Sequence, residues 1–203
     1  MMRVWDDMVD TSETARDRIL QAFLHLVSQR GIEATTTRAV AQEAGVNEVT
    51  IFRQFGDKAS LARELFRHFG NPEFIKSFPI EVDASTPELA VEGIRRSALL
   101  IYDTLKQRTD LLNFGLSEAW RYPDLAPAVS ATISAAQAYL QRVIEAAKPM
   151  LRQEVEPEAS ALHLQGLLAL SVIWQTRGLI THTDEEWKHI IEANIRLLVI
   201  DHP

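Results

Sequence analysis

Two short helix signals lie only three residues apart in the N-terminal part of the chain, and they restrict the possible folds more than any other feature. The first helix is expected over residues 38–44, after a run of three threonines whose hydroxyls suit an N-cap. Gly45 is expected to end it, and Asn47 to cap the next helix. The sequence therefore predicts two short helices joined by a tight turn.

Apolar spacing predicts a longer helix on each side of this pair. Before it, positions spaced i, i+3, i+4, i+7 and i+8 form one helical face: Ile19, Ala22, Phe23, Leu26 and Val27. Thr11 or Ser12 is expected to cap that helix and Gly31 to end it in a left-handed conformation. After the pair, Asp57 is expected to cap a fourth helix that reaches Phe69.

The C-terminal part of the sequence predicts only helices. Residues 70–85 contain two prolines and no sustained period, which is typical of a connection. Helices are expected over 87–106, 110–121, 123–148 and 157–178, and a last one after the capping box of Thr183 and Glu186. The fold class is therefore expected to be all-α, with one helical domain over residues 1–70, which contains the pair of short helices, and a second helical domain over 71–203.

Composition excludes several classes of protein. The chain has no cysteine, which excludes disulfides, thiolate metal sites and a cysteine nucleophile. No run of about 18 apolar residues occurs, so no membrane partner is expected, and residues 1–10 lack the apolar core of a signal peptide. The net charge is −7, but residues 1–70 hold nine basic against ten acidic side chains. A DNA-binding face would therefore carry few, well-placed cations.

The paired short helices predict a helix-turn-helix whose second helix enters the DNA major groove. Asn47 lies at the entering end, and Glu48, Thr50 and Arg53 are expected to face outward. Asn favours adenine, Thr the thymine methyl and Arg guanine, while Glu48 accepts from cytosine or excludes wrong bases. Phosphate contacts are expected at helix termini and flanks. The residues for these contacts are Thr36, Thr37, Arg38 and Lys58.

Residues 12–66 resemble the TetR family of transcriptional repressors. The residues that stand at the spacing of that family are Gly31, Ala41, Ala44, Gly45, Phe55, Lys58 and Leu61. The chain departs from the family pattern at Phe52, where tyrosine is usual, and at Gln54, where histidine or tyrosine is common. Loss of the phenol at Phe52 removes an expected phosphate hydrogen bond. The resemblance implies a homodimeric repressor in a bacterial-type cytoplasm, associated with the nucleoid and bound to double-stranded DNA at a near-palindromic operator.

The resemblance also implies that the C-terminal domain binds a small-molecule effector and forms the dimer. Apolar faces on the last two long helices independently favour a four-helix dimer interface. Its residues would be Leu162, Gly166, Ala169, Ile173, Trp187, Ile191, Asn194, Ile195 and Leu198. Aromatic and polar side chains suited to an effector pocket, or equally to core packing, are Tyr102, Phe114, Ser117, Trp120 and Trp174.

Two other functions remain open from the residues. A DNA-binding activator or architectural protein without an inducer would share the N-terminal half. An enzyme of the di-iron bundle type is the remote alternative, because Glu186 and His189 have the Glu-x-x-His spacing. Such a site needs two of these motifs and two further glutamates, and only one motif is present. We therefore expect no catalytic residue, no metal and no cofactor.

Overall fold

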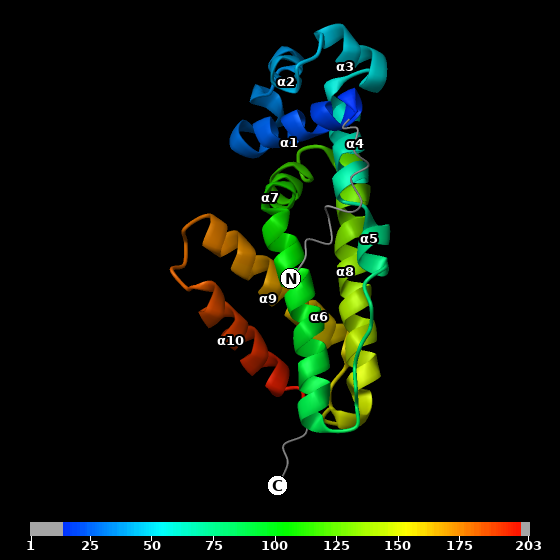
Figure 1. Ribbon diagram of the computed structural model, residues 1–203, viewed down its shortest axis with the longest axis vertical. Helices are drawn as coiled ribbons and strands as arrows, with labels where there is room; N and C mark the ends of the chain where they lie inside the picture. The colour runs from blue at the N-terminus through cyan, green and yellow to red at the C-terminus, as the bar shows by residue number, and fades with distance from the viewer. Residues whose placement is uncertain (1–13, 200–203) are drawn as a thin grey trace. The chain divides into compact units, whose positions relative to one another are not determined.

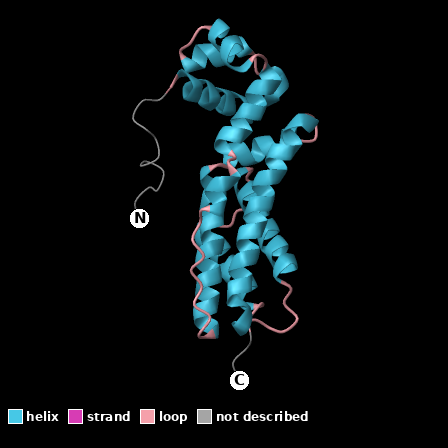
Figure 2. Cartoon of the chain, turned by 90° about the vertical axis from the view of Figure 1, so that its right-hand side faces the viewer, coloured by secondary structure: helices cyan, strands magenta, loops and turns pink. Residues whose placement is uncertain are grey.

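A computed structural model describes residues 14–199, and the regular elements in this range are helices (Figures 1 and 2). The only β contact among them is an isolated bridge between Leu151 and Val199. The predicted all-α fold is confirmed. The chain forms two compact units, one of residues 14–70 with Asn113–Val129 and one of Asn71–Leu112 with residues 130–199. The sequence had placed residues 113–129 with the C-terminal part.

Helix α1 (Ala15–Ala34) begins at a capping box formed by Thr14 and Asp17. The Thr14 hydroxyl accepts from the Asp17 backbone N–H at 3.2 Å, and the Asp17 carboxylate accepts from the Thr14 N–H at 3.1 Å. The expected caps, Thr11 and Ser12, lie outside the described residues, and the expectation was wrong because Thr14 caps the helix. These reciprocal bonds satisfy two of the N–H groups that a helix start leaves unpaired.

Gly31 interrupts α1 instead of ending it. Its φ of 77° and ψ of 169° are not the left-handed helical conformation that we expected, and one more turn follows to Ala34. This part of φ/ψ space is essentially restricted to glycine. A Cβ atom at position 31 would also lie 3.1 Å from Oε1 of the buried Glu118. Backbone conformation and close packing therefore both require glycine here.

Helices α2 (Thr37–Ala44) and α3 (Glu48–Phe55) form the predicted pair. The Thr36 hydroxyl caps α2 by accepting from the Ala39 N–H at 3.1 Å, and Asn47 Oδ1 caps α3 by accepting from the Val49 N–H at 2.9 Å. Gly45, in the left-handed conformation with φ of 64° and ψ of 37°, reverses the chain between them. The helix-turn-helix expected from the sequence is confirmed.

Helix α4 (Lys58–Phe69) is hydrogen-bonded to the end of α1 through the side chain of its first residue, Lys58. Asp57 caps α4, as expected, by accepting from the Ser60 N–H at 2.6 Å. The Lys58 Nζ donates to the backbone carbonyls of Ile32, Glu33 and Thr35 at 2.7, 3.2 and 3.1 Å. The last carbonyls of a helix have no partner within it and carry the negative end of its dipole. A single ammonium group therefore both caps α1 and positions α4.

The core of the N-terminal unit is completed by a segment distant in sequence. The end of α7 (Thr109–Glu118), the 3-10 helix η1 (Pro123–Leu125) and the start of α8 (Ala126–Ala147) belong to this unit. The Phe114 ring stacks on Phe66 at 5.1 Å between ring centroids and meets Phe23 edge-on at 6.5 Å. Aromatic pairs at such distances add to the free energy gained from burial. This segment therefore completes the core of the unit that carries the helix-turn-helix.

The second unit packs its long helices around one apolar core. It contains α6 (Pro87–Gln107), most of α8, α9 (Pro157–Thr176) and α10 (Asp184–Arg196), with the 3-10 helix η2 (Lys148–Met150) after α8. The expected capping box of Thr183 and Glu186 opens α10. A short helix, α5 (Pro72–Lys76), lies in the segment expected to be a plain connection, because Asn71 and Pro72 form a helix start.

We predict that Gly31→Ala lowers the free energy of unfolding by about 1–3 kcal/mol, because alanine is strained at this φ and ψ and its methyl group meets Glu118. Gly45→Ala is the matched control, since it also has a positive φ but no atom within 4 Å of a Cβ. Chemical denaturation followed by circular dichroism gives both values. A smaller loss at Gly31 than at Gly45 would contradict the role assigned to the Glu118 contact.

Lys58→Met is expected to lower the free energy of unfolding by about 1.5–3 kcal/mol, because hydrogen bonds from a charged donor are lost and the carbonyls at the end of α1 lose their cap. Thermal unfolding measures the change. Arg67→Met removes an exposed cation from the same helix and should leave the midpoint almost unaltered. Equal effects of the two substitutions would show that Lys58 contributes only as a surface charge.

Candidate nucleic-acid interface

Helix α3 is amphipathic, and its exposed face is the candidate for reading DNA. Ile51 and Phe55 are buried in the unit. On the opposite face Arg53 is exposed, and Val49 and Phe52 have exposed fractions of 69% and 49%. These three positions follow the i, i+3, i+4 spacing of one helical face. The face that α3 offers is therefore apolar with one cation.

Val49 is a candidate contact that our sequence analysis missed. Its exposed methyl groups suit the C5-methyl group of thymine, which proteins recognise by apolar contact. The spacing to Phe52 and Arg53 was visible in the sequence and could have identified it. Apart from Phe52, which we had taken as a DNA contact from the family resemblance, we had considered only polar side chains on this helix, and valine is not polar.

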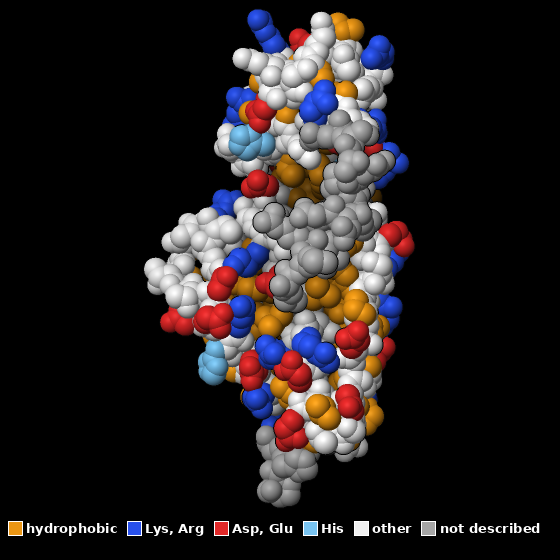
Figure 3. Space-filling model, in the orientation of Figure 1, with side chains coloured by type: hydrophobic (Ala, Val, Ile, Leu, Met, Phe, Trp, Pro, Cys, Tyr) orange, Lys and Arg blue, Asp and Glu red, His pale blue; other side chains and the backbone are white. Residues whose placement is uncertain are grey.

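The basic side chains of this unit are sparse, as its charge balance indicated. Figure 3 shows Lys and Arg side chains on the N-terminal unit as separate patches and not as a continuous band. Arg38, at the first turn of α2, and Arg53 are exposed. Neither guanidinium group forms a hydrogen bond or ion pair with another residue of the range 14–199. Both guanidinium groups are therefore available for phosphate or guanine.

Asn47 and Thr36 are at helix starts, as expected, but their side-chain oxygens are already used as caps. Reading adenine with both atoms of an amide needs the oxygen as well as the nitrogen. Asn47 would have to release the Val49 N–H to make that contact. In the described structure Asn47 therefore offers its amide nitrogen alone. Thr50 is half-buried on α3. Its arrangement is compatible with the contact to a thymine methyl group that we expected.

Glu48 and Thr37 bind each other instead of facing outward. The Thr37 hydroxyl donates to Glu48 Oε1 at 2.5 Å, which joins the first turn of α2 to the first turn of α3. The position of Glu48 at a helix start is electrostatically favourable for a carboxylate. Contacts of both side chains with DNA stay a prediction, and they would require this bond between α2 and α3 to open.

Lys58 is also directed away from a phosphate contact. Its ammonium group uses its three donors on the carbonyls at the end of α1. The residue lies at the start of α4, as expected, but the long side chain folds back along the protein. The phosphate contact of the Lys58 side chain stays a prediction, and it would require the ammonium group to release one of these carbonyls. The sequence position of a lysine does not reveal which acceptor its ammonium group reaches.

The side chains expected to form an effector pocket are divided between the two units. Phe114, Ser117 and Trp120 belong to the N-terminal unit. Phe114 is buried in its core, the Ser117 hydroxyl donates to the Phe114 carbonyl at 3.3 Å, and Trp120 has an exposed fraction of 73%. The Arg121 guanidinium lies 5.3 Å from the Trp120 ring. Within this unit these side chains do not converge on one cavity.

Tyr102 and Trp174 belong to the second unit. Tyr102 is buried, and its hydroxyl lies 2.7 Å from the Gln175 side-chain amide and 3.3 Å from Asp184 Oδ1. Burial raises the pKa of Tyr102, so the phenol stays neutral. Asp184 also pairs with Lys106. A polar cluster around the buried Tyr102, with Gln175 partly buried and Asp184 exposed, joins α6, α9 and α10. Gln175 and Asp184 were not identified from the sequence.

The residues expected at a dimer interface differ in exposure between α10 and α9. On α10, Trp187, Ile191 and Ile195 are buried within their own unit, so they cannot form an exposed interface as we expected. Asn194 on α10, whose amide donates to the Ile190 carbonyl at 2.9 Å, and Leu198, just after the end of α10, are partly buried. On α9 the apolar face is open to solvent. It consists of Leu162, Gly166, Ala169, Leu170 and Ile173.

Other classes of site find no support in the range 14–199. No group of three or more His, Asp or Glu side chains there is placed to hold a metal ion, and Glu186 closes the capping box with Thr183. No helix in the same range is long and apolar enough to cross a membrane.

Comparison with known proteins places the helix-turn-helix in a family. Residues 19–65 match the model of bacterial regulatory proteins of the tetR family. The chain is 29% identical over 109 residues to the regulator YvkB of Bacillus subtilis, covering 53% of this chain and 54% of YvkB. It is 28% identical over 114 residues to the repressor KstR2 of Mycolicibacterium smegmatis, covering 51% and 56%. The chain thus spans about half the length of these relatives.

Solved structures share the fold over nearly the whole chain. NalD of Pseudomonas aeruginosa, the secondary repressor of a multidrug efflux pump, aligns with a TM-score of 0.71 at 22% identity, covering 94% of this chain and 100% of NalD. NemR of E. coli aligns with a TM-score of 0.70 at 13% identity, covering 92% and 98%. The family is one of regulators and not of enzymes. Residues 19–65, which contain the helix-turn-helix, are thus similar to the tetR family of bacterial regulatory proteins.

Proposed function

We propose that the chain is a transcriptional repressor that binds a specific double-stranded DNA sequence as a homodimer and leaves it when a small molecule binds. The observation that carries the proposal is the exposed face of α3 on a tetR-family helix-turn-helix. Val49 and Phe52 offer apolar contact to bases, and Arg53 a bidentate donor for guanine. Repressor bound over a promoter in the cytoplasm excludes RNA polymerase sterically.

The open face of α9 supports the homodimer. It exposes Leu162 at 58% and has space around Gly166, where a Cβ atom would meet nothing within 4 Å. Two copies of such a face can approach closely and bury their apolar surface against each other. A two-fold dimer would place its α3 helices about 34–36 Å apart, on a near-palindromic site.

The polar cluster around Tyr102 is the place we propose for the effector. Buried polar groups among apolar helices provide the few oriented hydrogen bonds that fix a small ligand. Trp174, at the end of α9 next to Gln175, would supply an aromatic wall. The dimer would have one arrangement that fits the operator and one that does not. The effector can release DNA only if it binds the second arrangement more tightly than the first. Transcription assays with the operator in place separate a repressor from an activator.

Arg53→Ala is predicted to weaken binding to the specific duplex by about 5–150-fold, because a bidentate guanine contact is worth about 1–3 kcal/mol. Arg38→Ala is the matched variant. It should weaken binding to specific and unrelated duplexes alike and reduce the slope against salt by about one. Fluorescence anisotropy with DNA from upstream of the gene, at two salt concentrations, measures both. Specific affinity retained by Arg53→Ala would show that another element reads the DNA.

Leu162→Glu is expected to convert the dimer to a monomer, because a carboxylate on the α9 face would be buried without a partner at the interface. Analytical ultracentrifugation measures the mass. Leu89→Glu, which changes an exposed leucine of α6 in the same unit, should leave the dimer intact. A dimer unaffected by Leu162→Glu would place the interface elsewhere. Ile191 is unsuitable for this test, because a charge there would disrupt the core of its own unit.

A further inference from the structure

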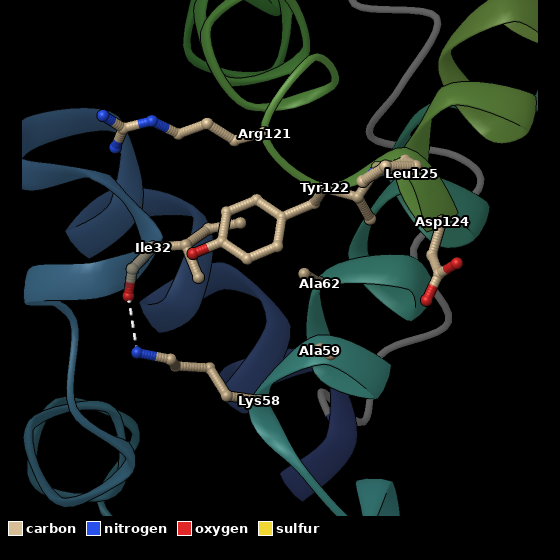
Figure 4. A pocket seen from close by; sticks show the side chains of 9 residues that line it. Ile32, Lys58, Ala59, Ala62, Arg121, Tyr122, Asp124 and Leu125 are labelled. Carbon is tan, nitrogen blue, oxygen red and sulfur yellow. Dashed lines mark hydrogen bonds between the residues drawn. The ribbon is translucent and has the colours of Figure 1, made fainter.

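The N-terminal unit contains a cavity of about 260 Å³ that neither the helix-turn-helix nor the proposed effector cluster uses. It lies among the end of α1, the start of α4 and the turn before α8 (Figure 4). Small side chains keep it open, because Ala59 and Ala62 stand on its α4 wall. A space of this size suits a molecule with one substituted ring.

The wall of the cavity is largely apolar, with an aromatic ring on one side. Ile32, Ala62 and Leu125 are buried side chains that line it. Figure 4 shows the Tyr122 ring reaching from the turn toward Ile32. Burial raises the pKa of Tyr122, assisted by the carboxylates of Glu33 and Glu118, so the phenol remains a neutral hydrogen-bond donor. An aromatic ligand would stack on or meet this ring edge-on.

The charged side chains of the lining favour an anion. Lys58 and Arg121 are its cations, and Asp124 is its one acid. The Asp124 carboxylate is already paired with Arg63 Nη1 at 3.2 Å. The lining itself therefore has two cations and one paired acid, while the carboxylates of Glu33 and Glu118 act on the Tyr122 phenol from outside the lining. From this lining we propose that the cavity binds a small aromatic monocarboxylate, with its ring against Ile32 and Ala62 and its carboxylate at the Lys58 ammonium group.

Lys58 links this cavity to the helix-turn-helix. Of its three hydrogen bonds, the one to the exposed carbonyl of Glu33 is the longest, at 3.2 Å. A carboxylate oxygen is a stronger acceptor for an ammonium group than a backbone carbonyl, so it would replace that bond. The segment from Glu33 to Thr36 leads directly into the cap of α2. Occupancy of the cavity should therefore alter DNA affinity, a consequence that rests on the proposed function, whereas the binding itself does not.

Calorimetric titration of the full chain tests the ligand class. The probes are benzoate and phenylacetate, with benzamide and benzylamine as neutral and cationic matches. We expect the two carboxylates to bind with a Kd on the order of 0.1–1 mM, which is usual for ligands of this size. The amide and the amine should bind at least about tenfold more weakly. Equal or tighter binding of the amine, or no binding of either acid at about 10 mM, would overturn the proposal.

Variants locate the site. Ala59→Phe fills the cavity from an exposed helix position and should abolish binding, whereas Arg121→Gln should weaken it by about five- to tenfold. Ala138→Phe adds the same ring to an exposed position of α8 in the other unit and should leave the Kd unaltered. Carboxylate binding that survives Ala59→Phe would place the ligand elsewhere and refute this site.

Anisotropy with the operator duplex then tests the link to Lys58. Saturating benzoate should alter the DNA affinity of the native chain more than twofold and that of Ala59→Phe not at all. An unaltered DNA affinity of the native chain would refute the link while leaving the ligand site in place. A chain that binds the acids but no DNA would refute the proposed function and not the cavity, so the two failures are distinguishable.

Discussion

The ammonium group of Lys58 holds together the unit that carries the helix-turn-helix. It bonds three carbonyls at the end of α1 while its own backbone starts α4, so one side chain fixes where two helices meet. The last turn of α1 would otherwise present unpaired acceptors at the point where the chain turns toward α2. Since Ile32 is both an acceptor for Lys58 and a wall of the cavity, the same contact connects that cavity to the DNA-binding helices.

Helix α3 divides its residues between internal bonds and the outside. Asn47 and Glu48 at its start are used to cap the helix and to hold α2, so they set the position of the helix more than they read bases. The residues left for DNA lie further along, at Val49, Phe52 and Arg53. An apolar face with one guanidinium group gives little non-specific electrostatic affinity. Because the chain has a net charge of −7, base contacts would have to provide most of the free energy of the DNA binding that we propose.

The second unit shows how burial redistributes residues that look alike in sequence. Helices α9 and α10 both carry apolar residues at helical spacing. The face of α10 fills the core, whereas α9 is apolar on more than one side and retains an open face after its inner side is packed. A helix that is apolar all round needs a second partner. The open face of α9 is therefore the surface that we propose for association, and the hydrogen bonds of Tyr102 mark the place that we propose for the effector.

The sequence by itself determined the helical class, the helix-turn-helix and most of its caps, because these depend on contacts within a few residues. Thr36, Gly45, Asn47 and Asp57 act on their own helix ends, and their roles follow from spacing alone. The tertiary structure alone decided which acceptor Lys58 reaches, that Glu48 bonds Thr37, and that residues 113–129 return to the first unit. Those outcomes depend on which helix surfaces come into contact when the chain packs. The spacing of residues within one helix holds no information about such tertiary contacts.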